Sequence, residues 1–149
     1  MFRKIINKLL GKPKDSMSFM ESMNLVNLPV VTFFQGDKRF NFLLDTGSNS
    51  SVIDKNVLKI IKHTMTNNPD LSNIMGMDGI LHQTQSCEIT LYYKDREYTY
   101  EYIVQDMKEA FTSIKQSSGV TLHGIIGSSF FNKFKYVLDF DELIAYSKM

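Results

Sequence analysis

The sequence predicts an all-β domain of many short strands with one or two short helices. Aromatic residues make up 12% of the 149 residues, with eleven Phe, seven Tyr and no Trp, and pleated sheet surfaces favour aromatic side chains. Short runs of β-branched and aromatic residues alternate with turn signals. The hydrophobic fraction of 43% is ordinary for a globular chain, and this length suffices for one domain with its own core.

The first expected elements form a hairpin. Residues 28–34 and 39–44 are rich in apolar and β-branched residues, and they flank the turn Gln35-Gly36-Asp37-Lys38. Residues 51–54 are another short apolar piece, and residues 56–62 predict a brief helix or turn.

Two more hairpins follow. Residues 74–83 contain Asp78-Gly79, a strong two-residue turn signal. Residues 87–93 and 97–104 alternate on either side of Lys94-Asp95-Arg96, and Tyr98, Tyr100 and Tyr102 form a stripe that packs a sheet face or recognises a ligand. The remaining expected elements are helices at 106–115 and 128–134 and strands at 122–126, 136–140 and 143–146.

The charge distribution divides the chain into a basic N-terminal segment and a mildly acidic domain. Residues 1–14 carry five of the 17 basic residues and no acidic one, so the rest holds 12 basic and 16 acidic residues. We expect a basic helix and linker at 1–24 and the folded domain at 25–149. In residues 1–12 the apolar residues share one helical face and the basic residues lie off it. This pattern predicts either a helix in weak contact with an anionic membrane surface or a short tail helix. The acidic balance of the domain argues against nucleic acid as a partner.

The cysteine content and the absence of targeting signals in the sequence bear on the cellular compartment. Cys87 is the single cysteine, so an intramolecular disulfide is impossible and a small apolar residue in a strand is expected. No run approaches the roughly 18 apolar residues that span a bilayer, and no small-residue cleavage site follows the basic start. We expect a cytoplasmic protein.

The segment with chemical information is Asn41-Phe42-Leu43-Leu44-Asp45-Thr46-Gly47-Ser48. An apolar strand here delivers an aspartate into a tight turn. Gly47 allows close backbone approach, while Thr46 and Ser48 supply hydroxyl groups that can hold the turn and the carboxylate. A turn aspartate that caps backbone amides is the alternative reading.

This segment resembles the active-site motif of aspartic proteases, and its downstream context resembles the retropepsins. Gly124-Ile125-Ile126-Gly127 is similar to the apolar-apolar-Gly motif that follows the flap in retropepsins and supports the active-site turn. The resemblance covers about residues 28–146 and implies a retropepsin-like acid protease barrel. Residues in the place of the flap hairpin, expected to bind substrate, are Ile74, Met75, Gly76, Met77, Asp78, Gly79, Ile80 and Leu81.

The resemblance implies a homodimer, because pepsins carry two such turns in a chain of about twice this length and this chain carries one. Peptide hydrolysis needs both an activated water and a protonated leaving group, and two carboxylates that share one proton supply both. A two-fold axis provides the second carboxylate from Asp45 of another chain. We also expect Ser48 to donate a hydrogen bond to the Asp45 carboxylate and to lower the apparent pKa of the pair.

Other chemistries have weaker support. The sequence has no G-x-S-x-G, Walker or dinucleotide motif, and His63, His82 and His123 are too scattered for a local metal site. We therefore expect neither a metal nor a cofactor. Two functions remain: an endopeptidase that acts on polypeptides, and a catalytically weak or inactive retropepsin-like module that dimerises or binds peptides.

Overall fold

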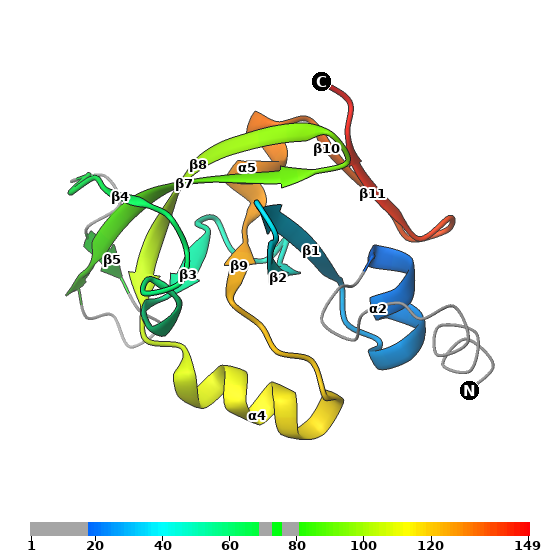
Figure 1. The fold of residues 1–149 in the computed structure, drawn as a ribbon, viewed down its shortest axis with the longest axis horizontal. Helices are drawn as coiled ribbons and strands as arrows, with labels where there is room; N and C mark the ends of the chain where they lie inside the picture. The colour runs from blue at the N-terminus through cyan, green and yellow to red at the C-terminus, as the bar shows by residue number, and fades with distance from the viewer. Residues whose placement is uncertain (1–17, 69–72, 76–80) are drawn as a thin grey trace.

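A closed barrel of six strands forms the centre of the molecule (Figure 1). The computed structural model describes residues 18–68, 73–75 and 81–149. The barrel strands are β1 (Val30–Gln35), β2 (Lys38–Leu44), β3 (Val52–Asp54), β7 (Gln85–Tyr93), β8 (Arg96–Gln105) and β9 (Gly124–Ile126). Their spatial order is β1-β2-β9-β3-β8-β7, and the ring closes where Phe34 pairs with Tyr92. The pairs β2–β9 and β3–β8 are parallel, whereas the others in the ring are antiparallel. This all-β architecture agrees with the predicted fold class.

Smaller elements surround the barrel. Strand β4 (Thr64–Met65) pairs with the middle of β7, and β5 (Asn73–Met75) forms an antiparallel ladder with β6 (Leu81–Gln83). Strands β10 (Tyr136–Asp139) and β11 (Ile144–Ser147) form a separate two-stranded sheet. The helical elements are α2 (Phe19–Val26), the 3-10 helix η1 (Lys55–Val57), α4 (Lys108–Ser118) and α5 (Ser128–Lys133).

The two long hairpins turn where the sequence predicts. In the first, Gln35 pairs with Lys38, and Gly36 has the positive φ of 62° that this tight turn requires. In the second, Tyr93 pairs with Arg96 across Lys94 and Asp95, whose φ angles of 48° and 62° are also positive. Two successive residues in that region give the strand twist that suits a two-residue loop.

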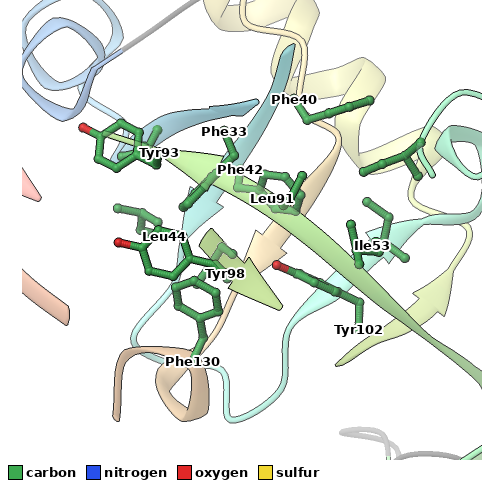
Figure 2. Packing of buried hydrophobic residues seen from close by; sticks show 14 of the residues in the cluster. Phe33, Phe40, Phe42, Leu44, Ile53, Leu91, Tyr93, Tyr98, Tyr102 and Phe130 are labelled. Carbon is green, nitrogen blue, oxygen red and sulfur yellow. The ribbon is translucent and has the colours of Figure 1, made fainter. Parts of the chain in front are cut away.

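Aromatic side chains fill the barrel interior (Figure 2). Phe33 meets Phe42 and Tyr98 edge to face, with ring centroids 5.6 Å and 5.8 Å apart. Phe130 of α5 closes one end of this core and lies 5.6 Å from Tyr98. Tyr98 and Tyr102 are buried and Tyr100 packs against the same cluster, so the tyrosine stripe forms part of the core.

Helix α2 begins in the segment 1–24 that we expected to be a basic helix and linker, and its last two residues belong to the expected domain. Ser18 caps its N-terminus by accepting the N–H of Glu21. The ring of Phe19 is fully buried and packs edge to face on Phe140 at 5.2 Å, while the hydroxyl of Ser22 accepts the N–H of Val30 at 3.0 Å. The linker expectation therefore does not hold for residues 19–24, because apolar spacing over a single two-turn helix gave too weak a sequence signal.

Helix α4 comes between β8 and β9 in the chain, and it runs along the lower edge of the molecule in Figure 1. Phe111 of this helix is buried with Val30, Val120 and Leu122 in a second apolar cluster, separate from the barrel core. Side chains of α2 also pack on this cluster, so the two helices share one small core outside the barrel. This second core adjoins the strands that carry the predicted site.

Cys87 is buried in β7, and burial raises the pKa of its thiol to about 11, which suits the expected apolar strand residue. Among the helices of the described residues, none is long and apolar enough to cross a membrane. The basic segment at 1–12 lies outside the described residues.

Candidate active site

Asp45 begins the turn that follows β2. Its backbone N–H donates to the carbonyl of Ile126 at 2.8 Å, which continues the parallel ladder of β2 and β9 one residue beyond the paired Leu44 and Ile126. The side chain of Asp45 is partly exposed, and Thr46 and Gly47 at the tip of the turn are exposed. The turn therefore presents its carboxylate at the surface of an otherwise rigid strand pair.

Hydrogen bonds within the turn orient the carboxylate. The N–H of Gly47 donates to Oδ1 of Asp45 at 2.9 Å, and the N–H of Ser48 donates to the Asp45 carbonyl at 3.3 Å. A Cβ at position 47 would lie 3.2 Å from Oδ1, closer than ordinary van der Waals contact. Gly47 thus lets the chain fold tightly around the carboxylate.

The hydroxyl of Ser48 has a different partner from the one the sequence suggested. It donates to the carbonyl of Ser50 at 2.8 Å. A hydroxyl group has a single proton to donate, so this bond leaves none for the Asp45 carboxylate. The expectation that Ser48 donates to Asp45 is wrong for this structure, because the turn folds back toward β3 and offers a nearer carbonyl.

The segment Gly124-Ile125-Ile126-Gly127 lies directly beside the Asp45 strand. Gly124 pairs with Phe42 and Ile125 pairs with Leu43 in parallel register. A Cβ at position 124 would lie 2.5 Å from the Phe42 ring and 2.6 Å from the Val52 carbonyl. Gly124 is therefore required by the close approach of β9 to both neighbouring strands.

Gly127 and the start of α5 hold the far side of the turn. The N–H groups of Ser128 and Ser129 donate to the carbonyls of Ser48 and Asn49 at 2.7 Å and 3.2 Å, and the N–H of Gly127 donates to Oγ of buried Ser51 at 3.0 Å. A Cβ at position 127 would lie 2.4 Å from the Ser50 carbonyl oxygen and 2.7 Å from that of Ser48. These contacts leave no room for a side chain at position 127.

Strand alternation places an apolar pair on the same face as Asp45. Phe42 and Leu44 point into the barrel core, whereas Leu43 packs on the second cluster outside it. Successive residues of a strand face opposite sides, and the Asp45 N–H continues the ladder, so the Asp45 side chain lies on the face of Leu43. Ile125, the partner of Leu43, belongs to the same outer cluster. This position of Leu43 was not predicted, although the alternation of Leu43 with Phe42 and Leu44 in the sequence indicates it.

The described residues include the two strands of the predicted flap, β5 and β6. Residues Ile74 and Met75 lie in β5, Leu81 lies in β6, and the backbone pairs Ile74 with His82 and Met75 with Leu81. A hairpin is therefore present at the expected place. The tip, residues Gly76, Met77, Asp78, Gly79 and Ile80, lies outside the described residues.

A buried polar network lies between β2 and the loop that enters β9. The N–H of Asn41 donates to Nδ1 of His123, and the N–H of His123 donates to the Asn41 carbonyl, both at 2.8 Å. The Asn41 side chain accepts the hydroxyl of Thr32 at 2.6 Å and donates to the carbonyl of Thr121 at 2.8 Å. Burial lowers the pKa of His123. No sequence motif marked this network, because its members are far apart in the chain and have ordinary spacing.

A small hollow of about 220 Å³ borders the outer flank of the turn. Asn49, Ser50 and Ser51 line it from the turn, with Glu101 of β8 and Lys133 of α5 on other sides. Within the described part of the chain, no cluster of three His, Cys, Asp or Glu side chains is arranged to hold a metal ion.

Comparison with known proteins identifies the fold. The chain is similar to the retroviral protease-like domain of Ddi1 from Leishmania major, with a TM-score of 0.51 and 10% identity over 81% of this chain and 88% of that domain. It is also similar to EIAV protease in complex with the inhibitor HBY-793, with a TM-score of 0.48 and 23% identity over 75% of this chain and 92% of that protease. A retropepsin-like aspartic protease from Rickettsia conorii gives a TM-score of 0.44 and 13% identity over 76% of this chain and 77% of that one. No family model and no curated protein matches the sequence.

The protein therefore has the retropepsin-like fold. The closed mixed barrel and the match to the Leishmania domain establish this class of structure. At 10% identity the two chains share the fold and little of the sequence, so the chemistry has to be argued from the residues of the turn itself.

Proposed function

We propose that the chain is an aspartic endopeptidase that hydrolyses polypeptides as a homodimer, with Asp45 of each subunit in the active site. The observation that carries this proposal is the Asp45 turn, where the N–H of Gly47 holds the partly exposed carboxylate at 2.9 Å and β9 fixes the backbone. A turn aspartate that only caps backbone amides would make the same Gly47 bond, so the proposal depends also on the exposed tip of Thr46 and Gly47 beside the carboxylate. That exposed tip is free to meet the same tip of a second chain.

The chemistry follows from two carboxylates in contact. Two such groups about 3 Å apart cannot both ionise, so they share one proton. The ionised member removes a proton from water, whose oxygen then bonds to the peptide carbonyl carbon. The protonated member donates its proton to the carbonyl oxygen in the same step, which gives a tetrahedral diol. As the C–N bond breaks, the leaving nitrogen receives the proton that was taken from water, and one diol hydroxyl returns its proton to the other carboxylate while the C=O bond forms again. The pair titrates as a unit, so its two pKa values belong to the dimer.

Strand pairing offers a mode of substrate binding. An extended peptide would lie between the Asp45 pair and the hairpin of β5 and β6, with its backbone bonded to strand edges and its side chains in separate pockets. The weaker candidate function, a module that binds peptides without cleaving them, uses the same surface. We further propose a cytoplasmic location and, for residues 1–12, a weak contact with anionic membranes.

The decisive experiment compares the wild-type chain with Asp45→Asn on an unfolded protein substrate between pH 3 and 7. Asn is nearly isosteric but cannot exchange the shared proton, so cleavage should be lost while the melting temperature and the dimer remain. Retained cleavage by purified Asp45→Asn protein would refute the assignment. Peptide binding without cleavage by the wild-type chain would favour the module instead.

Mixing the two proteins tests the shared site. If each active site needs both Asp45 residues, an equal amount of Asp45→Asn chain should lower the activity per wild-type chain to roughly half as dimers exchange partners. An inert protein added at the same concentration is the control. Activity per wild-type chain that is unaffected by the variant would show that one subunit suffices.

A further inference from the structure

The C-terminal hairpin of β10 and β11 has one packed face and one open face. Leu138 pairs with Ala145, and both side chains pack in the barrel core. Successive residues of a strand face opposite sides, so Val137, Ile144 and Tyr146 form an outer hairpin face. Neither apolar cluster of the described residues includes these three side chains, and Ile144 is 39% exposed. The described part of the chain therefore covers this apolar face only in part.

The two ends of the hairpin differ in charge. The turn carries the exposed Asp141 and Glu142, whose N–H groups both donate to Oδ1 of Asp139 at 2.9 Å. The open end bears the exposed Lys135 and Lys148. A cationic segment on the outer hairpin face is therefore attracted toward the turn and repelled from the open end.

The described part of the chain begins beside this acidic turn. Ser18 caps α2, and Phe19 packs on Phe140 of the turn with ring centroids 5.2 Å apart. Figure 1 shows α2 next to the turn of the hairpin. Only residues 13–17 separate Ser18 from residues 1–12, and five residues span up to about 17 Å. Each hairpin strand has four residues and is about 13 Å long, so residues 1–12 can reach the outer hairpin face.

Residues 1–12 match this face in polarity and in charge. Residues 1–14 carry five basic residues and no acidic one, which complements the acidic turn. A helix of under three turns is marginal alone in water and needs a surface for its apolar side. At about 18 Å, a 12-residue helix is long enough to cover the hairpin strands. The apolar side chains that share one helical face are Phe2, Ile5, Ile6, Leu9 and Leu10.

We propose that residues 1–12 dock on the outer hairpin face of the same chain, with their apolar side against Val137, Ile144 and Tyr146. The basic residues of the segment then lie beside the acidic turn. A membrane would take up the same apolar side, so docking and membrane contact exclude one another. The basic segment is thus a cover of the domain that an anionic membrane surface has to displace.

Limited digestion with trypsin measures the docking in the full-length chain. Every chain carries Asp45→Asn, so that the proposed protease activity cannot cut it. Trypsin cleaves after Lys4 and Lys8 when the segment is undocked, and the rate follows the population of the undocked state. Ile144→Asp should accelerate this cleavage by about 10-fold, the scale of one buried aliphatic side chain.

The matched control is Ile60→Asp, which changes an isoleucine of similar exposure, 46%, outside the hairpin. It should leave the rate unchanged. Neither substitution alters the sequence around the cleaved bonds, so a difference in rate reports the contact and not the preference of trypsin.

A second pair of variants tests the charges. Asp141→Asn combined with Glu142→Gln should accelerate cleavage by about 3-fold, the scale of exposed ion pairs. Asp95→Asn combined with Glu97→Gln neutralises two exposed acids at the turn between β7 and β8. This control should leave the rate unchanged.

Equal cleavage rates with and without Ile144→Asp would overturn the inference, and Ile144→Ser is the milder variant if Ile144→Asp does not fold. Protection that requires vesicles of anionic phospholipid would assign the segment to a membrane. Protection that increases with protein concentration would assign it to a second copy of the chain. Either result would overturn docking within one chain. Because Asp45 is replaced in every chain, none of these outcomes affects the proposed function.

Discussion

The backbone N–H of Asp45 donates to the carbonyl of Ile126 at 2.8 Å, so the candidate catalytic residue is bonded to a strand residue 81 positions later in the chain. This bond lies one step beyond the last paired residues of β2 and β9. The position of the carboxylate is therefore set by β9 as well as by its own strand. Changes on the β9 side should affect the site without touching Asp45.

Gly127→Ala is expected to destabilise the fold and to abolish cleavage. The new Cβ would lie 2.4 Å and 2.7 Å from the carbonyl oxygens of Ser50 and Ser48, which are backbone atoms of the turn and cannot rotate away. We expect a loss of about 3 kcal/mol or more in the free energy of unfolding, the upper range for overpacking. Denaturant unfolding measures this loss.

The matched control is Gly36→Ala, where a Cβ would meet no atom within 4 Å. Its cost of about 1 kcal/mol comes only from the positive φ of that position. Gly127→Ala would contradict the packing argument if it were no more costly than Gly36→Ala.

Ser48→Ala should reduce activity modestly and leave the pH–rate profile unmoved. The hydroxyl donates to the Ser50 carbonyl at 2.8 Å, so its removal costs about 1 kcal/mol of turn stability rather than a bond to the carboxylate. Matched profiles on one peptide substrate provide the measurement. If the acidic limb of the profile moved to higher pH in Ser48→Ala, the hydroxyl would have to donate to Asp45 in the proposed dimer.

Phe19→Ala should lower the free energy of unfolding by about 3 kcal/mol, the usual scale for a buried Phe. Phe19 is 1% exposed and packs on Phe140, so the change leaves a cavity between α2 and the turn after β10. Met20→Ala is the control, because the neighbouring side chain on the same helix is 38% exposed. Equal effects of the two variants would mean that α2 is not part of the cooperative unit.

Acid should weaken the fold through His123. Burial lowers the pKa of this residue, and its Nδ1 can accept the Asn41 N–H only while unprotonated. The nearby Asp54 carboxylate acts in the opposite direction. The native state thus binds fewer protons than the unfolded state, so stability is complete above the unfolded His pKa of about 6.5 and falls as the pH decreases below it.

Urea unfolding between pH 5 and 8 measures whether the free energy of unfolding falls as the pH decreases. In His123→Asn the side-chain oxygen can accept the same N–H without titrating, so the dependence on pH in this window should flatten. His63→Asn controls for the loss of a histidine outside this network, since the Nδ1 of His63 lies 2.8 Å from the Ile61 carbonyl. Equal slopes in the wild-type chain and His123→Asn would exclude the network as the cause.

The hairpins and the Asp45 turn were predictable because their signals are local. Gly36-Asp37 and Lys94-Asp95 stand between alternating strands, and this arrangement alone fixes a two-residue turn. The pairing of β5 with β6 also agrees with the hairpin expected around Asp78-Gly79. The retropepsin-like barrel then followed from the resemblance of two short motifs.

What the sequence did not reveal depends on contacts between distant segments. Helix α2 forms because Phe19 can be buried against Phe140, about 120 residues away. The Ser48 hydroxyl could not be assigned from its neighbour Asp45, because its acceptor depends on how the turn folds back. The Asn41–His123 network joins residues whose individual positions in the sequence carry no signal.

The parallel register of β2 and β9 also limits which side chains can stand beside Asp45. If the ladder is extended past Leu44 and Ile126, Asp45 comes to stand opposite Gly127. A second acid cannot be introduced there by a point mutation, because even a methyl group at that position would collide with the carbonyls of Ser48 and Ser50. An acid at position 127 would therefore disrupt the turn that holds Asp45, instead of placing a second carboxylate beside it.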